Sequence, residues 1–207
     1  MFKIWRLFQP LKIYTRSISG QRNIPAGPCI VASNHAGPLD SSLIMLALKR
    51  DVRFIAARHL LQTNGLMGWY HRRILFSVGQ AIPSGEHCIE TCRKVLQNGQ
   101  SIGIFPEGDI HPALRQGRIH TGAVVLSHQT QIPIVPIHIT ESGRLWPIYP
   151  LWKIKFWRVR SVIITIGRPI SPPTSGSHLT TSDYQQSSDQ LMANIYEMGH
   201  NNNGTRR

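Results

Sequence analysis

Residues 29–46 read CIVASNHAGPLDSSLIML, and the order of residue types in this stretch decides the fold class. An apolar run ends in polar residues at 33–35, a Gly-Pro turn follows, and Asp40 opens an apolar helical pattern. A strand that is apolar on both faces and leads through a short loop into a helix is typical of an α/β sheet covered by helices. Such folds carry their chemistry in the loops at strand ends, so this loop is the candidate site.

The same alternation of strand and helix continues on both sides of this stretch. We predict an α/β fold with a mixed, mostly parallel sheet flanked by helices. The predicted strands are Cys29–Ser33, Val52–Ala56, Ile74–Val78, Ser101–Phe105, Ile134–Ile139 and Ser161–Ile166, and the predicted helices are Asp40–Arg50, Gly85–Asn98, His120–Gln129 and Asp183–Met198. Pro133 and Pro136 bracket the fifth strand, which predicts a sheet edge or a bulge there.

The chain has 207 residues, enough for one substantial domain. We expect a short basic helical leader at 1–22, a main domain at 23–200 and a polar tail at 201–207. The leader mixes aromatic and basic side chains, and two interpretations stay open. It is a segment that lies at a membrane interface, or a helix packed on its own domain.

The charge distribution favours an anionic partner. Lys and Arg number 23 against 10 Asp and Glu, for a formal net charge of +13. No acidic residue precedes Asp40, and none lies between Glu141 and Asp183. Such basic stretches attract nucleic acid, anionic lipid or phosphorylated substrates.

Within the second acid-free stretch, Trp146–Trp157 interleaves aromatic and cationic residues. This pattern suits a lipid headgroup region, single-stranded nucleic acid or an ordinary pair of partly buried strands. No apolar run reaches the roughly 18 residues of a membrane span. The first 20 residues lack the apolar core of a signal peptide, and three cysteines indicate a reducing compartment.

His35 and Asp40 carry the candidate chemistry. Four residues separate them, so the turn can fold the carboxylate back onto the imidazole. An Asp that accepts from one ring N–H fixes the tautomer and leaves the other nitrogen as a base. The alternative is that Asp40 is a helix N-cap and His35 an ordinary loop histidine.

Residues 34–40, NHAGPLD, resemble the NHx4D motif of the glycerolipid acyltransferase family, which includes lysophosphatidic acid acyltransferases. Four further segments resemble blocks of that family in the right order. They are FIAARHL at 54–60, Gly68-Trp69 with Arg72-Arg73, FPEG at 105–108 and IPIVPI at 132–137. On this resemblance, 23–200 is identified as an acyltransferase domain.

The resemblance implies an O-acyltransferase in which His35 is the general base, Asp40 its partner, and Glu107 and Gly108 bind the acceptor. It implies acyl-CoA or acyl-carrier protein as the acyl donor, with no further cofactor and no metal. The implied acceptor is a lysophospholipid, 1-acylglycerol-3-phosphate, which gives phosphatidic acid. Two alternatives stay open: another acceptor, such as glycerol-3-phosphate or another lyso-lipid, and a non-catalytic basic module that binds nucleic acid.

Two departures from the family leave the acceptor open. The family usually reads FPEGTRS where this chain reads FPEGDIH, so Ile110 replaces an arginine. The second block usually has an arginine soon after its glycine, and residues 79–85 have none. We name Arg115, Arg118 and Arg58 as candidate phosphate ligands, against the alternative that they are solvated surface arginines.

The same resemblance, together with the basic stretches, predicts a peripheral protein at the cytoplasmic face of a membrane. Its expected partners are a lyso-glycerolipid acceptor, an acyl thioester donor, an anionic membrane surface and acyl-carrier protein as one form of the donor, with no nucleic acid.

Overall fold

The computed structural model describes residues 3–37, 39–57, 81–108, 119–140, 162–174 and 178–203. Its helices are two 3-10 helices, η1 (Ile4–Tyr14) and η2 (Gln21–Asn23), and the α-helices α1 (Asp40–Leu48), α3 (Cys88–Gln97), α4 (Gly122–Thr130) and α5 (Thr181–Asn203). Its strands are β1 (Thr15–Ser19), β2 (Ile30–Ser33), β3 (Val52–Ala56), β4 (Ala81–Pro83), β5 (Ser101–Ile104), β6 (Ile134–Thr140) and β7 (Val162–Ile166).

The strands form one sheet in the order β1-β7-β6-β2-β5-β3-β4. Among the strands described, five of the six neighbouring pairs are parallel, and β6 with β7 is antiparallel. Strands β2 and β5 lie inside the sheet, and every residue of both is buried. The predicted fold class, a mixed and mostly parallel sheet flanked by helices, is confirmed.

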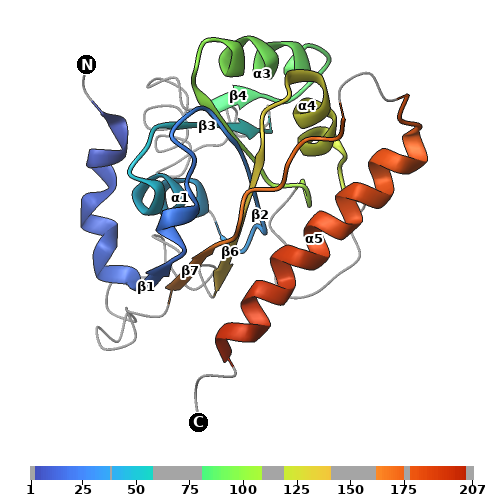
Figure 1. Ribbon diagram of the computed structural model, residues 1–207. Helices are drawn as coiled ribbons and strands as arrows, with labels where there is room; N and C mark the ends of the chain where they lie inside the picture. Colours follow the sequence, from blue (N-terminus) through green and yellow to red (C-terminus); the bar gives the residue numbers. More distant parts are fainter. Residues whose placement is uncertain are drawn as a thin grey trace.

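Helices cover both faces of the sheet, as Figure 1 shows. On one face, α1 and η1 pack over a core that includes Val31, Val135 and Ile164. On the other, α3, α4 and α5 pack over a core that includes Ile30 and Ile102. Successive side chains of a strand point to opposite faces, so neighbours such as Ile30 and Val31 enter different cores.

The N-terminal leader is part of the domain. Phe8 in η1 is 6% exposed and lies in the core, with Ile4 and Trp5 packed beside it. β1 then pairs in parallel with β7 at the edge of the sheet. One face of η1 is therefore packed on the domain, while its residues Arg6, Leu7 and Lys12 are exposed.

Of the two features predicted at the prolines around β6, the structure contradicts one. We predicted a sheet edge or a bulge, but β6 lies inside the sheet between β2 and β7, so the edge was wrong. The antiparallel pairing fits the other alternative, a bulge. Between the paired residues Ile134 and Ile170 and the paired residues Ile137 and Ile166, β6 has two residues and the opposite segment has three. Pro136 falls within this irregularity, where its carbonyl accepts a hydrogen bond from Gly167 at 2.8 Å. A residue without an N–H is tolerated at such an interruption of the ladder.

Three elements differ from the sequence prediction. β1 was not predicted because its side chains are mostly polar and its burial pattern is that of an edge strand. β4 is only three residues long. α5 begins earlier than expected because Thr180 and Asp183 cap it reciprocally: Asp183 accepts from the Thr180 amide, and Thr180 Oγ1 accepts from the Asp183 amide. The predicted strand at 74–78 lies outside the described residues.

Candidate active site

The topology brings two loops together at one edge of the sheet. His35 follows β2, and Glu107 follows β5. These strands are parallel neighbours, with Ile30 aligned to Ile102 and Ala32 to Ile104. Carboxyl ends of adjacent parallel strands meet at the same edge, so residues 72 positions apart in sequence become neighbours.

Asp40 lies at the first position of α1, and its carboxylate turns back onto the loop before it. Its Oδ2 is 2.9 Å from Nδ1 of His35. The same oxygen accepts hydrogen bonds from the backbone N–H groups of Ala36 at 2.7 Å and Gly37 at 2.8 Å. The Asp40 side chain is fully buried, and that of His35 is 19% exposed. Asp40 therefore orients the imidazole and organises the whole loop.

An ionised carboxylate only accepts hydrogen bonds, so Nδ1 of His35 carries the proton. Nε2 is then the basic nitrogen. The aspartate thus acts on the ring and its loop, which goes beyond the alternative of a simple helix cap.

Aromatic rings form a column behind the imidazole. The rings of His35 and Phe105 are stacked, with centroids 4.0 Å apart and planes 11° apart. Phe54 stacks on Phe105 at 5.3 Å. Gly103 makes room for this column, because an added Cβ there would lie 2.3 Å from a ring carbon of Phe54. One face of the imidazole is therefore covered by an apolar ring.

Glu107 holds the backbone of the same histidine. Its Oε2 accepts a hydrogen bond from the His35 N–H at 2.8 Å. Its Oε1 accepts a hydrogen bond from the hydroxyl of Tyr196, which comes from α5. Burial, together with the neighbouring Glu107, raises the pKa of Tyr196 above its usual value. Both carboxylate oxygens of Glu107 therefore have partners within the protein.

Gly108 adopts a left-handed backbone conformation, with φ +78°. Its N–H bonds to the carbonyl of Phe105 at 2.9 Å, and the His120 N–H bonds to the carbonyl of Pro106 at 2.8 Å. A Cβ at position 108 would lie 2.8 Å from Nε2 of His120. An exposed imidazole thus lies against the loop that carries Glu107.

Asn34 ties the end of β2 to β6. Its side-chain amide donates to the carbonyl of Ile139 at 2.9 Å and accepts from the Ile139 N–H at 2.8 Å. The side chain is buried. This two-point attachment fixes the backbone immediately before His35.

The structure brings some predicted site residues together and is silent on others. His35, Asp40, Glu107 and Gly108 converge at one edge of the sheet. Arg58, Arg115 and Arg118 lie outside the described residues. Tyr196 and His120 were not predicted as site residues, because neither belongs to a sequence motif that would give it a local signal.

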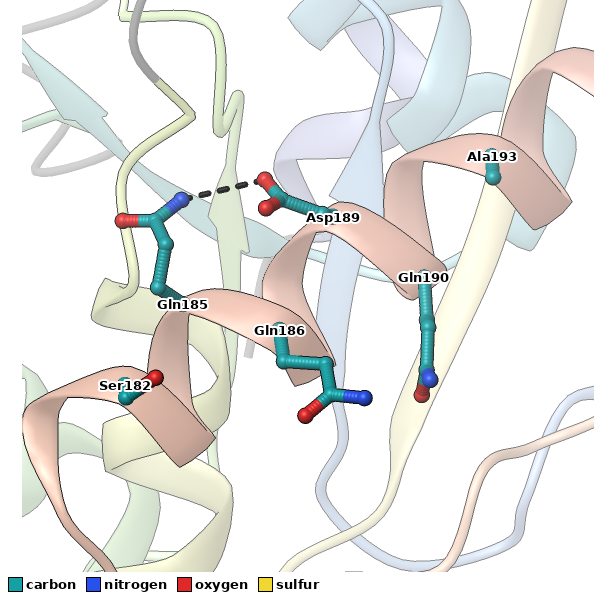
Figure 2. A pocket seen from close by; sticks show the side chains of 6 residues that line it. All are labelled: Ser182, Gln185, Gln186, Asp189, Gln190 and Ala193. Carbon is teal, nitrogen blue, oxygen red and sulfur yellow. Dashed lines mark hydrogen bonds between the residues drawn. The ribbon is translucent and has the colours of Figure 1, made fainter.

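Figure 2 shows a surface depression lined by Ser182, Gln185, Gln186, Asp189, Gln190 and Ala193, all from α5. Gln185 donates from Nε2 to Asp189 at 3.0 Å, the contact drawn there, and also to the carbonyl of Ile119 at 3.2 Å. Ala193 is the one apolar residue of the six.

Two features outside the loop bear on the sequence predictions. Cys29, Cys88 and Cys92 are all free thiols, and Cys92 is buried in a hydrophobic core. Within the part of the chain that the structure describes, no helix combines the length and apolarity needed to cross a membrane.

Known proteins that this chain resembles in sequence are described as acyltransferases. Residues 15–140 match the sequence model of a family described as Acyltransferase. The chloroplastic 1-acyl-sn-glycerol-3-phosphate acyltransferase of Brassica napus is 27% identical over 154 residues, which cover 70% of this chain and 43% of that protein. The corresponding protein of Arabidopsis thaliana is also 27% identical, with 70% and 41% covered. The chain thus spans less than half the length of these relatives.

The fold has a counterpart among solved structures. The 1-acyl-sn-glycerophosphate acyltransferase of Thermotoga maritima superposes with a TM-score of 0.66 at 20% identity, covering 95% of this chain and 78% of that one. At this identity the likeness concerns the fold alone.

Proposed function

Because the chain belongs to the acyltransferase family, we propose that it transfers a fatty acyl group from a thioester to a hydroxyl of a lysophospholipid. The proposed acceptor is 1-acylglycerol-3-phosphate, and the product is phosphatidic acid. The donor is acyl-CoA or acyl-carrier protein, with no further cofactor. The observation that carries the proposal is the His35–Asp40 contact of 2.9 Å at the carboxyl end of a parallel strand.

In the proposed reaction, Nε2 of His35 takes the proton of the acceptor hydroxyl as the oxygen attacks the thioester carbonyl carbon. A C–O bond forms and gives a tetrahedral intermediate. Its collapse breaks the C–S bond, and the imidazolium returns the proton to the departing thiolate. Asp40 keeps Nδ1 protonated and stabilises the imidazolium. No acyl-enzyme is needed, because the nucleophile belongs to the substrate.

The test is transfer of labelled acyl groups from acyl-CoA to 1-acylglycerol-3-phosphate by the purified full chain. His35→Ala should reduce kcat by about 10²–10⁴-fold, the usual contribution of a general base. His178→Ala is the matched control, since His178 is exposed and separate from the loop. Near-normal turnover by His35→Ala would remove His35 from the mechanism.

The acceptor of the acyl group is tested separately. Ile110 stands where the family usually has arginine, which favours a second candidate acceptor, such as another lyso-lipid or glycerol-3-phosphate. A panel of these acceptors at equal concentration ranks them by kcat/KM. If Arg115 or Arg118 binds an acceptor phosphate, its replacement by Ala should raise the acceptor KM and leave the donor KM unchanged.

We also propose that the protein works on an anionic membrane surface, at its cytoplasmic face, without nucleic acid as a partner. Support comes from the net charge of +13 and from η1, where Arg6, Leu7 and Lys12 are exposed, as is Lys3 immediately before the helix. Basic residues near anionic lipid gain about 1 kcal/mol each.

Sedimentation with vesicles tests the membrane surface. Binding to anionic vesicles should exceed binding to neutral ones and should weaken in high salt. The informative variant replaces Lys3, Arg6 and Lys12 with Gln. Truncation is unsuitable because Phe8 belongs to the core. Equal binding of this variant and the wild type would exclude η1 as the contact, and preferential binding of oligonucleotides would favour the nucleic-acid alternative.

A further inference from the structure

We propose that Tyr196 is a positioning residue of this active site, whose hydroxyl holds Glu107 in the orientation that fixes the backbone of His35. This inference rests on the proposed function for its effect on turnover, but its structural part can be tested without activity. Tyr196 lies in α5, well beyond the segment 15–140 that matches the family. A helix outside that segment would then complete the site.

Glu107 is held from two sides. Its two carboxylate oxygens have different donors: the Tyr196 hydroxyl on Oε1 and the His35 N–H on Oε2, the latter at 2.8 Å. A carboxylate held on one side only can turn about its side-chain torsions. A donor on each oxygen defines its plane, and hydrogen bonds to an ionised acceptor are stronger than neutral ones. Tyr196 therefore fixes the direction from which Glu107 meets His35.

A second feature is the attachment of α5 to the domain. Leu191, Met192 and Ile195 of this helix are buried in the core under the sheet. Before them, the Tyr184 hydroxyl lies 2.7 Å from Nδ1 of His128 in α4. After them, Gly199 lies so close to His138 of β6 that an added Cβ would be 2.4 Å from the ring. Tyr196 thus projects from a firmly docked stretch of helix.

A third feature is the state of the hydroxyl. Tyr196 is 36% exposed, although its hydroxyl contacts Glu107, which in turn binds the backbone of His35. Burial and Glu107 both raise the pKa of Tyr196, so its hydroxyl stays protonated and remains a donor at neutral pH. A donor in this place orients the site without taking part in proton transfer.

The experiment compares Tyr196→Phe with Tyr184→Phe in the full-length protein. Both tyrosines belong to α5 and both hydroxyls contact a side chain outside the helix, but only the Tyr196 hydroxyl contacts Glu107. Tyr196→Phe should lower kcat about tenfold and leave the donor KM unchanged. Tyr184→Phe should leave kcat within about twofold of wild type, whatever its effect on stability.

A readout independent of turnover is hydrogen exchange of the His35 amide. Loss of the Tyr196 hydroxyl frees Glu107 to move, so protection of this amide should fall about tenfold in Tyr196→Phe and stay unchanged in Tyr184→Phe. A wild-type protein that transfers no acyl group would refute the proposed function, while this measurement would still report on Tyr196.

A double-mutant cycle with Glu107→Ala completes the test. If Tyr196 acts through Glu107, Tyr196→Phe should change kcat less than about twofold in the Glu107→Ala background. Additive losses would overturn the proposal, as would wild-type kcat and exchange in Tyr196→Phe. Equal losses from both tyrosine variants would also overturn it, because they would trace the effect to general loosening of α5.

Discussion

Asp40 and Glu107 hold the same histidine from opposite ends. Asp40 contacts the ring from five residues away, within one loop. Glu107 contacts the backbone amide from 72 residues away and is itself held by Tyr196, a further 89 residues along the chain. The near contact is reinforced locally, since two backbone amides of the same loop donate to the same oxygen of Asp40. The distant contact depends on the docking of a helix. The chemistry is thus set locally, and its alignment is set by the whole domain.

The largest effect should come from a substitution of Asp40, which makes the near contact. Asp40→Asn keeps the size of the side chain but presents an amide to an imidazole that needs an acceptor at Nδ1. We expect kcat to fall by about 10²–10⁴-fold with the fold retained. Steady-state kinetics with circular dichroism as the fold control measures this. Full activity would show that Asp40 only supports its loop, and would contradict the view that the near contact sets the chemistry.

The distant side should give a smaller effect. Glu107→Gln still offers one oxygen, but it loses the charge that strengthens both hydrogen bonds. We expect kcat/KM to fall by about 10-fold, because the contact between His35 and Asp40 is intact. If Glu107 also binds the acceptor, as the family resemblance implies, the acceptor KM will rise as well. A loss as large as that of Asp40→Asn would show that the two sides are equally important.

A third prediction concerns stability more than turnover. Asn34→Ala leaves the N–H and carbonyl of Ile139 without their side-chain partner inside the protein. The free energy of unfolding should fall by about 1–3 kcal/mol. Denaturant unfolding measures this, and activity at a temperature where the variant is folded should change little by comparison. A large loss of kcat without a loss of stability would place Asn34 with the catalytic loop.

The smallest predicted effect is a pH dependence of stability, and it arises at His138, where α5 packs on β6. Burial, and secondarily the charge of His200, lowers the pKa of His138 to about 4. Since an unfolded histidine titrates near about 6.5, the unfolded state binds the proton first as the pH falls. Stability from this group is therefore complete above pH ~6.5 and declines towards pH ~4, by at most about 1.4 kcal/mol per pH unit.

The check is denaturant unfolding of wild type and His138→Gln between neutral pH and pH ~4.5. The difference between the two should shrink as the pH falls. His178→Gln controls for an exposed histidine and should run parallel to wild type. A difference that does not change with pH would show that His138 titrates alike in both states.

The near side could be predicted from sequence, and the distant side only in part. His35 and Asp40 belong to one strand–turn–helix segment, so local pattern was enough to place them together. Glu107 was identified by resemblance, as an acceptor-binding residue. Its contact with His35 requires β2 and β5 to be neighbours, which the order along the chain does not dictate. Tyr196 requires the docking of α5 as well, and the burial of Phe8 depends on tertiary packing that the pattern of the first 22 residues does not show.

Gly103 is a further residue whose effect on the site depends on tertiary packing. It touches no reacting group, and a glycine inside a strand is ordinarily a weakness. Here its missing side chain makes room for Phe54, which lies against Phe105, which in turn lies against His35. Any side chain at position 103 would overlap the ring of Phe54 and disturb the column. A library of random variants selected for turnover should therefore recover glycine at this site, whereas neighbouring apolar positions of the same strand drift among Val, Ile and Leu.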